Sequence, residues 1–269
     1  MPQPLILDQS ALAAFVTCPR RFQLRYLLQA PWPSSPLDSQ QNQAVERGRA
    51  FHRLVEQHLH GVAVSADLIA DPVVRGWWRS FQTDGPAKAG GRLFPEHRLT
   101  VPASSSFLAG RFDLLVVNQD ADHPSLAIYD WKTSSPRTAE ALRSEWQTRL
   151  YLALAAEGSS AFLPPDRTLS PEDISLSYWY PTDPDAAVEL QYNSEWHQEN
   201  WAQILSLVTD IERLNPGQVW PLTNDLQRCR SCMYQAHCGR QEAGTAPFLA
   251  EEEARYTAET ALLLEPHLP

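Results

Sequence analysis

The stretch that decides the fold is LAIYDWKTSS, residues 126–135. Its apolar start, up to Tyr129, predicts a strand, which is followed by Asp130 and, two residues later, by Lys132. Because side chains alternate across a strand, Asp130 and Lys132 point to the same face. These ten residues fit two interpretations, a salt bridge at a solvated strand end and a functional pair. The choice between them depends on the neighbouring sequence.

Two further strands are predicted just before this one. The segments RLFPEHRLTVPA (92–103) and FLAGRFDLLVVNQ (107–119) have strand-like patterns, and the polar turn after the second one predicts an antiparallel hairpin. In that hairpin Asp113 would meet Asp130. Two adjacent carboxylates repel each other unless a cation lies between them, and Mg²⁺ prefers such oxygen ligands. An acid pair alone is typical of a solvated edge, but the lysine on the same face favours a metal site.

Helical patterns surround the strands. The expected helices cover residues 8–29 (divided by Pro19), 44–61, 66–84, 138–158 and 194–214 (starting with a Ser cap), and a second strand pair covers 174–181 and 187–193. A Pro/Ser-rich connector at 30–43 predicts a mobile loop, and 215–240 is irregular. Helices come first, then strands, then a helix, then more strands. This order predicts an α+β or mixed-sheet α/β fold around one central sheet and argues against a doubly wound fold.

Three segments together carry a resemblance to a known family: GRFDLLVV (110–117), AIYDWKTS (127–134) and WQTRLYLAL (146–154). They resemble the nuclease core of the PD-(D/E)XK superfamily, in its RecB-like branch. The resemblance implies a restriction-endonuclease-like α/β fold, with a central mixed sheet flanked by helices, and a metal-dependent nuclease. It implies that Asp113 and Asp130 bind Mg²⁺ or Mn²⁺, and that the lysine of the D-x-K signature helps to orient or activate the attacking water.

The same resemblance extends to other residues. Gln147 and Tyr151 match the Q-x-x-x-Y helix motif, and their spacing puts both on one helix face. The implied role is support of the active site or of the DNA backbone; the alternative is a helix packed on the sheet with two polar positions at its edge. GRAFHRLVE (48–56) resembles the G-x-x-x-H element, in which His52 reaches the metal. Glu96 is a candidate for the acidic residue that many relatives have before the first Asp.

The cysteines form a second candidate site. Cys229, Cys232 and Cys238 make a C-x2-C-x5-C pattern, and Cys18 lies far upstream. Four thiolates hold either zinc or a [4Fe–4S] cluster. Zinc sites more often use paired CxxC elements, and only one is present. The RecB-like branch contains an iron–sulfur subgroup with one cysteine before the nuclease core and three after it, which includes CRISPR-associated RecB-type exonucleases and AddB-type subunits. The resemblance therefore implies a [4Fe–4S] cluster, with structural Zn²⁺ as the alternative.

Charge and composition set limits on the function. Acids outnumber bases 32 to 22, which is not typical of a protein that coats nucleic acid nonspecifically. Arg20, Arg21 and Arg25 follow the first cysteine and are candidates for phosphate binding, although such runs are usually solvated faces. No apolar run is long enough to span a bilayer, and the amino terminus lacks a signal-peptide pattern. We therefore expect a cytoplasmic protein without membrane contact, whose cysteines are metal ligands rather than disulfides.

These observations lead to one leading prediction and two alternatives. Residues 1–245 are expected to form one RecB-like nuclease domain, with its core at about 45–195 and iron–sulfur flanks at 10–30 and 215–240, followed by an acidic tail at 246–269. The leading prediction is a Mg²⁺- or Mn²⁺-dependent deoxyribonuclease, an exonuclease on single strands or ends, that works in DNA repair, recombination or CRISPR adaptation with the proteins of those systems. The alternatives are a DNA-binding accessory subunit with little activity of its own and a zinc-stabilised RNA nuclease. No G-x-x-x-x-G-K-[ST] motif is present, so a helicase–nuclease is excluded.

Overall fold

The structure is a computed structural model that describes residues 4–31, 39–86, 90–119, 124–164 and 167–245. The chain divides into two compact units. Unit 1 combines the residues up to Gln9 with Arg47–Asp210, and unit 2 combines Ser10–Glu46 with the residues from Ile211 onward. The expected boundary of a single domain at residue 245 stays a prediction, and the expected acidic tail lies outside the described residues.

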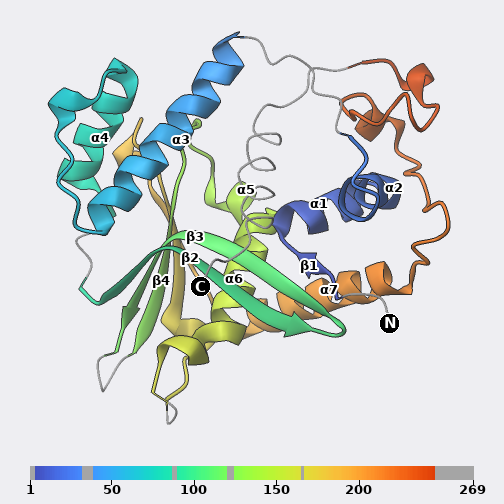
Figure 1. The fold of residues 1–269 in the computed structure, drawn as a ribbon. Helices are drawn as coiled ribbons and strands as arrows, with labels where there is room; N and C mark the ends of the chain where they lie inside the picture. The colour runs from blue at the N-terminus through green and yellow to red at the C-terminus, as the bar shows by residue number, and fades with distance from the viewer. Residues whose placement is uncertain (1–3, 32–38, 87–89, 120–123, 165–166, 246–269) are drawn as a thin grey trace, which may run out of the picture. The chain divides into compact units, whose positions relative to one another are not determined.

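A mixed six-stranded sheet forms the centre of unit 1 (Figure 1). Its strands are β1 (Ile6–Leu7), β2 (Arg92–Ala103), β3 (Ser106–Asn118), β4 (Ser125–Trp131), β5 (Ile174–Trp179) and β6 (Val188–Gln191). The strand order is β1-β3-β4-β5-β6, and β2 also pairs with β3. The pairs β2–β3, β3–β4 and β5–β6 are antiparallel, whereas β1–β3 and β4–β5 are parallel. The predicted α/β fold with one mixed central sheet flanked by helices is therefore confirmed.

Helices fill the connections between these strands. They are α1 (Gln9–Thr17), α2 (Pro19–Phe22), α3 (Ser39–Leu59), α4 (Pro72–Asp84), α5 (Ala139–Arg143), α6 (Trp146–Gly158) and α7 (Ser194–Arg213), and a π-helical turn (Gln23–Leu27) follows α2. The helices α5 and α6 lie in the crossover between β4 and β5, because two parallel strands cannot be joined by a tight turn. The predicted break at Pro19 is confirmed, since α1 ends at Thr17 and α2 begins at Pro19.

Two predicted helix starts were wrong. The helix expected from residue 66 begins instead at Pro72, because the Asp71 carboxylate accepts hydrogen bonds from the amides of Val73 and Val74 and caps the helix there. A short 3-10 turn, Ala66–Leu68, precedes it. The helix expected from residue 44 already begins at Ser39, inside the segment that was expected to be a loop. The rest of that expected loop, 32–38, lies outside the described residues.

Two further helix predictions need correction at their caps. The helix expected over 138–158 is broken into α5 and α6, and at the break the Leu142 carbonyl accepts from the Glu145 amide and from the Thr148 hydroxyl. The predicted Ser cap of α7 was also wrong. The side chain of Asn193 caps this helix by accepting from the Trp196 amide, while Ser194 donates to Glu172.

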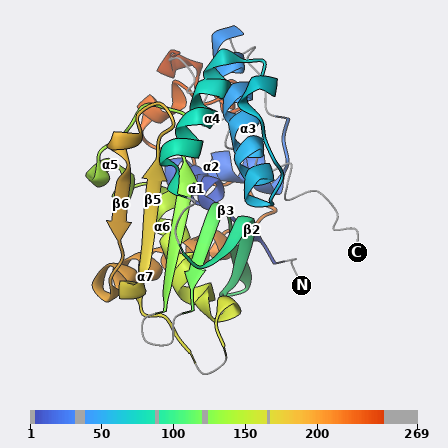
Figure 2. The ribbon, with the colours of Figure 1, turned by 90° about the vertical axis from the view of Figure 1, so that its left-hand side faces the viewer.

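An aromatic cluster covers one end of the sheet in unit 1. Figure 2 shows α4 and the neighbouring part of α3 over the ends of the strands. Phe51 and Val55 of α3 and Trp78 and Phe81 of α4 are buried there against Trp131 and Trp179, which lie at the ends of β4 and β5. Burying six large side chains fixes the position of α3 relative to the end of β4. This matters for the site, because Asp130 immediately precedes one of these tryptophans.

Unit 2 joins two distant parts of the chain through buried contacts. The rings of Phe22 and Trp220 stack with centroids 5.6 Å apart. The buried side chain of Gln23 donates to the Gln218 carbonyl and accepts from the Trp220 amide at 2.9 Å. Arg228 donates to the carbonyl of Val16 at the end of α1. These contacts hold the segment before the last three cysteines against the segment that carries the first one.

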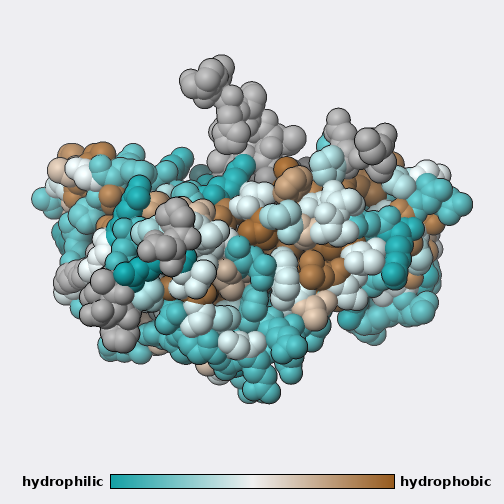
Figure 3. All heavy atoms as spheres, turned by 90° about the horizontal axis from the view of Figure 1, so that it is seen from below, coloured by the Kyte–Doolittle hydropathy of each residue, from teal (hydrophilic) through white to brown (hydrophobic). Residues whose placement is uncertain are grey.

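The surface shows few large apolar side chains. On the face drawn in Figure 3, hydrophobic residues form separate brown spots among hydrophilic teal. Leu68, at 86% exposed, and Val219, at 77% exposed, are the most exposed large hydrophobic residues of the described chain, and they belong to different units. None of the described helices combines the length and the apolar character needed to cross a membrane.

Candidate functional site

The β3–β4 hairpin brings the two predicted acids together. Leu114 pairs with Tyr129 in the antiparallel register, which puts Asp113 opposite Asp130. The Trp131 amide donates to Asp113 Oδ2 at 2.8 Å, so the carboxylate of β3 reaches across to the backbone of β4. The sequence predicted this meeting from the strand pattern and the turn. Whether the two acids bind metal stays a prediction.

His52 reaches the same point from α3. Its Nδ1 lies 3.2 Å from Asp113 Oδ1, and its Nε2 lies 3.1 Å from the Trp131 carbonyl oxygen. Gly48, one turn earlier, lies close to the segment that leaves β4: a Cβ at that position would lie 3.1 Å from Thr133 Oγ1. The G-x-x-x-H spacing thus places a small residue at the close approach and the histidine at the acids.

Glu96 completes a group of possible metal ligands. Ligand atoms of His52, Glu96 and Asp113 all lie within 4.8 Å of one another. Glu96 has a φ of +47°, which is rare for a residue with a side chain and is found mostly where function or tight geometry requires it. Arg111 Nε lies 3.2 Å from Glu96 Oε2. One nitrogen and two carboxylates form a donor set that suits a hard or borderline divalent cation, so the residues present fit the metal that the resemblance implies.

Asp130 has a different set of partners. Lys132 Nζ lies 2.6 Å from Asp130 Oδ1, and Gln147 Nε2 donates to Asp130 Oδ2 at 2.6 Å. Lys132 Nζ also donates to Gln147 Oε1 at 2.8 Å, which closes a triangle. The structure therefore brings Asp130 and Lys132 together as their spacing indicated. Both carboxylate oxygens of Asp130 thus contact side chains of the protein itself.

Tyr151 lies one turn after Gln147 on α6 and contacts a different strand. Its hydroxyl donates to the Arg111 carbonyl of β3, and its ring packs on Phe112 with centroids 4.6 Å apart. A Cβ at Gly110 would meet Leu154 Cδ1 at 2.8 Å, so α6 and β3 are in close contact here. In this geometry Gln147 touches the charged groups, whereas Tyr151 holds α6 on the strand that carries Asp113.

Burial and neighbouring charges shift the pKa values of these groups. Burial disfavours a charged imidazole, but Asp113, Glu96 and Asp130 outweigh this effect and raise the pKa of His52 to about 9. Burial, together with the charge of Asp113, raises the pKa of Glu96 to about 7. For Asp113 the effect of burial is outweighed by His52 and by the Trp131 amide, which lower its pKa below the usual value. Burial raises the pKa of Asp130 despite the attraction of Lys132.

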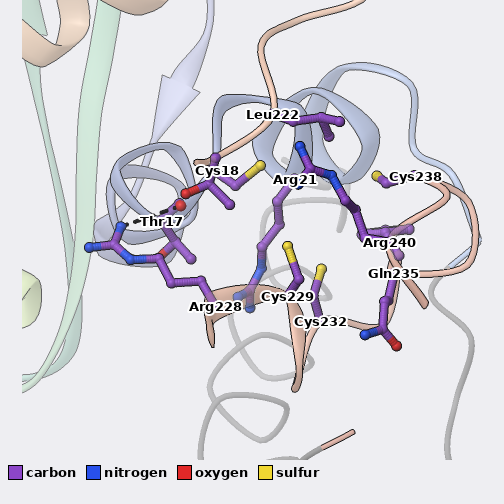
Figure 4. Close-up of a pocket in the computed structure, with 12 residues that line it drawn as sticks. Thr17, Cys18, Arg21, Leu222, Arg228, Cys229, Cys232, Gln235, Cys238 and Arg240 are labelled. Atoms are coloured by element: carbon purple, nitrogen blue, oxygen red, sulfur yellow. Dashed lines mark hydrogen bonds between the residues drawn. The ribbon is translucent and has the colours of Figure 1, made fainter. Parts of the chain in front are cut away.

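The four cysteines line one pocket in unit 2 (Figure 4). Cys18 and Cys229 are buried, and Cys232 and Cys238 are half-buried. Among the described residues, no three of these sulfur atoms lie within 4.8 Å of one another. Four thiols are the donor set that both Zn²⁺ and a [4Fe–4S] cluster use, so which of the two they hold stays a prediction.

The arginines that follow Cys18 have different environments. Arg20 donates to Gln23 Oε1, Arg21 lines the cysteine pocket, and Arg21 and Arg25 are only 7% and 6% exposed. A role of these three residues in binding nucleic acid stays a prediction. The sequence reasoning missed Arg111, which pairs with Glu96. The alternation of β3 could have indicated it, because Arg111 and Asp113 are two residues apart and point to the same face.

The comparisons with known proteins agree with this fold. The profile of the PD-(D/E)XK nuclease superfamily matches residues 7–239. The chain belongs to the PD-(D/E)XK nuclease superfamily. Its fold is similar to that of a solved protein from Eubacterium rectale described as a "putative exonuclease", with a TM-score of 0.51, 11% identity, and coverage of 82% of this chain and 85% of that one. A solved structure of SSO0001 aligns with a TM-score of 0.41 and 15% identity over 88% of this chain and 87% of that one. No curated protein matches the chain significantly.

Proposed function

We propose that this protein is a metal-dependent deoxyribonuclease that hydrolyses phosphodiester bonds, acting as an exonuclease on single strands or ends. One observation carries the proposal: His52, Glu96 and Asp113 converge within 4.8 Å beside the Asp130–Lys132 pair, in a chain of this superfamily. The three ligand atoms come from two strands and one helix and meet at one point. Packing alone does not explain this, because burial disfavours the charged form of Glu96 and raises its pKa.

Each residue has a distinct proposed role. His52, Glu96 and Asp113, with Asp130 next to them, would hold Mg²⁺ or Mn²⁺, which when bound supplies a Lewis acid that stabilises charge on the phosphate. Lys132 Nζ, 2.6 Å from Asp130, orients the attacking water and stabilises the developing negative charge. Gln147 keeps Lys132 in place through its 2.8 Å hydrogen bond. Tyr151 fixes α6 against β3, so that both acids and Gln147 keep their spacing.

The cysteine pocket is proposed to hold a [4Fe–4S] cluster, in the manner of the RecB-like branch. The support is that all four thiols line one pocket. DNA repair, recombination or CRISPR adaptation in the cytoplasm is the proposed setting, with proteins of those systems as partners. These assignments rest on the resemblance of the motifs and not on the geometry of the acids.

A digest of end-labelled single- and double-stranded DNA, with Mg²⁺, Mn²⁺ or EDTA, tests the proposed activity. The parent should shorten labelled strands from an end with either metal and should leave them intact in EDTA. Asp113→Asn should remove this activity, whereas Asp185→Asn, at an exposed turn before β6, should cleave like the parent. Binding of DNA without any metal-dependent cleavage would favour an accessory subunit, and cleavage of RNA alone would favour the ribonuclease alternative.

A further inference from the structure

Arg111 lies beside the candidate metal ligands and pairs with one of them. Its Nε is 3.2 Å from Glu96 Oε2, and the Arg111 side chain is 32% exposed, whereas that of Glu96 is 13% exposed. The Tyr151 hydroxyl donates to the Arg111 carbonyl, so the backbone that carries this guanidinium is held against α6. The side chain of Arg111 thus starts from a fixed point of β3 and is partly open to solvent.

The contact between Arg111 and Glu96 is an ion pair without a well-aligned hydrogen bond. Among the side-chain atoms of the described chain, Glu96 Oε2 is one that is buried and accepts no hydrogen bond. A buried acceptor in this state is unusual and calls for an explanation, such as a ligand that the carboxylate binds. Glu96 also offers a ligand atom within 4.8 Å of those of His52 and Asp113. Its use as a ligand of a divalent cation therefore explains the loose ion pair.

A bound divalent cation would weaken the hold of Glu96 on Arg111. Such an ion has twice the charge of a guanidinium and contacts a carboxylate at a shorter distance than the 3.2 Å of the ion pair, so it attracts Glu96 more strongly. The two cations also repel each other. Arg111 then loses the carboxylate that balances its charge, at the edge of a site that has just gained two positive charges.

The other cationic side chains of the acid site are engaged differently. Lys132 has two partners, Asp130 and Gln147. His52 is itself a candidate metal ligand. Of these three cations in the described site, Arg111 is the one whose carboxylate partner the metal takes. A guanidinium binds two oxygens of a carboxylate or of a phosphate through parallel N–H groups, so a phosphate can replace the lost partner.

We propose that Arg111 binds a phosphate of the DNA strand once a metal ion has taken Glu96 from it. This inference rests on the proposed nuclease function and deepens it by assigning a substrate-binding residue. In the metal-free protein the guanidinium stays on Glu96 and contributes little to DNA binding. With metal bound, it turns to a non-bridging oxygen of the phosphate beside the ion. Arg111 thus makes DNA binding depend on prior metal binding.

Fluorescence anisotropy with a labelled single-stranded DNA tests this on the full chain, in EDTA and in Ca²⁺, with the strand length checked on a gel. Ca²⁺ takes oxygen ligands as Mg²⁺ does. A pH of 8.5 lies above the pKa of about 7 of Glu96, so this carboxylate is charged. The variants are Arg111→Gln and Arg111→Lys. Arg79→Gln is the matched control, because Arg79 also pairs with a carboxylate, that of Asp67, but its side chain is 62% exposed.

Arg111→Gln should weaken DNA binding about tenfold in Ca²⁺ and less than about twofold in EDTA, because the charged hydrogen bonds to phosphate exist only with metal bound. Arg111→Lys should lie between Arg111→Gln and the parent, since an ammonium keeps the charge without the paired N–H groups. Arg79→Gln should change binding little and equally in both conditions. An equal loss in EDTA and in Ca²⁺, or no loss, would overturn the proposal. If Arg111→Gln fails to fold, Arg111→Lys must show the loss confined to Ca²⁺.

Mn²⁺ binding without DNA, measured by calorimetry at the same pH, separates this role from simple support of Glu96. Arg111→Gln should bind Mn²⁺ at least as tightly as the parent, because a competing positive charge is removed. Arg79→Gln should match the parent. Weaker Mn²⁺ binding by Arg111→Gln would mean that Arg111 only holds Glu96 in place, and the proposal would then be wrong.

The outcomes distinguish a failure of this proposal from a failure of the nuclease function. If the parent cleaves DNA with Mg²⁺ and Arg111→Gln keeps the parent's DNA affinity in Ca²⁺, the role of Arg111 is wrong and the acid site stands. If the parent neither cleaves DNA nor binds it better in Ca²⁺ than in EDTA, the nuclease function is wrong, and the role of Arg111 with it.

Discussion

The acid site and the cysteine pocket hold their charges in opposite ways. In the acid site each carboxylate has a cationic side chain next to it: Asp113 has His52, Glu96 has Arg111 and Asp130 has Lys132. In the cysteine pocket burial and the neighbouring cysteines raise the pKa values of Cys229 and Cys238, so these thiols stay neutral without a metal. The first site is thus electrically balanced by the chain itself, whereas in the second these two thiols become thiolates only when they bind a metal. Metal removal should therefore affect the two regions differently.

The largest effect is expected from a substitution that removes the positive charge beside Asp130 in the acid site. Lys132→Met should lower the rate of DNA cleavage about a thousandfold, because the group that orients water and stabilises charge is lost. It should also lower the free energy of unfolding of the metal-free protein by about 3 kcal/mol, since buried Asp130 loses its partner at 2.6 Å. Single-turnover cleavage and urea unfolding in EDTA measure the two effects.

Lys132→Arg separates the two roles of this lysine. It keeps the positive charge beside Asp130 and should retain most of the stability, but the wide guanidinium should not restore the position of the ammonium, and cleavage should stay low. Parent-like cleavage by both variants would mean that Lys132 is only a partner of Asp130.

The next effect concerns the cysteine pocket. Cys18→Ser and Cys232→Ser should each abolish metal retention and lower the free energy of unfolding by several kcal/mol, about equally, because both thiols belong to one site. Removing Mg²⁺ from the acid site should cost far less, since the acids keep their cationic partners. Metal analysis and thermal unfolding of the two variants, beside the parent in EDTA, make the comparison. If Cys18→Ser keeps its metal and its stability, Cys18 is an ordinary thiol.

A smaller effect tests the close contact that supports the acid site. Gly110→Ala should destabilise the protein by about 1–3 kcal/mol, because the new Cβ would lie 2.8 Å from Leu154 Cδ1 and 3.1 Å from the ring of Tyr151. The matched control is Gly76→Ala on α4, where a Cβ meets nothing within 4 Å. That control should stabilise by about 0.5–1 kcal/mol through helix propensity. Chemical denaturation of both variants measures the difference, and equal midpoints would mean that α6 shifts freely on β3.

The sequence predicted the parts of the site that depend on regular strand geometry. The alternation in β4 put Asp130 and Lys132 on one face, and the hairpin between β3 and β4 brought Asp113 opposite Asp130. Both features follow from the alternation of side chains along a strand and from the antiparallel turn between β3 and β4. Residues close in sequence determine both. The prediction of one central mixed sheet was based on the same strands.

The parts that were missed depend on contacts between distant residues. The left-handed conformation of Glu96 has no local signal, because neither Pro95 nor His97 requires it. The two-residue strand β1 is too short for a pattern and exists only through its parallel pairing with β3. The break between α5 and α6 lies inside a sequence with continuous helical character, where the Leu142 carbonyl accepts from Glu145 and Thr148. Such features are set by packing after the local elements have formed.

The smallest expected effect is a slope of stability with pH that the acid site produces. His52 has a pKa of about 9, above its ordinary 6.5, so its stabilisation is complete below pH 6.5 and is lost as the pH rises through 9. Glu96 has a pKa of about 7, above its ordinary 4.5, so its cost accumulates between these values as the pH rises. Both shifts mean that the folded protein binds more protons than the unfolded chain, and the free energy of unfolding in EDTA should fall between pH 5 and pH 9. The change attributable to His52, which is partly exposed, should be on the order of 1–2 kcal/mol.

Two variants assign the slope to its residues. His52→Gln should flatten the half above pH 6.5 and Glu96→Gln the half below pH 7, as followed by urea unfolding in EDTA at each pH. Saturating Mg²⁺ should reduce the slope in the parent, because a bound cation replaces the protons of both ligands, and its affinity should rise with pH for the same reason. The depressed pKa of Asp113 lies below this range and does not contribute. A slope that persists in the double variant would have to come from other groups, and Asp130, whose pKa burial also raises, is the one within the acid site.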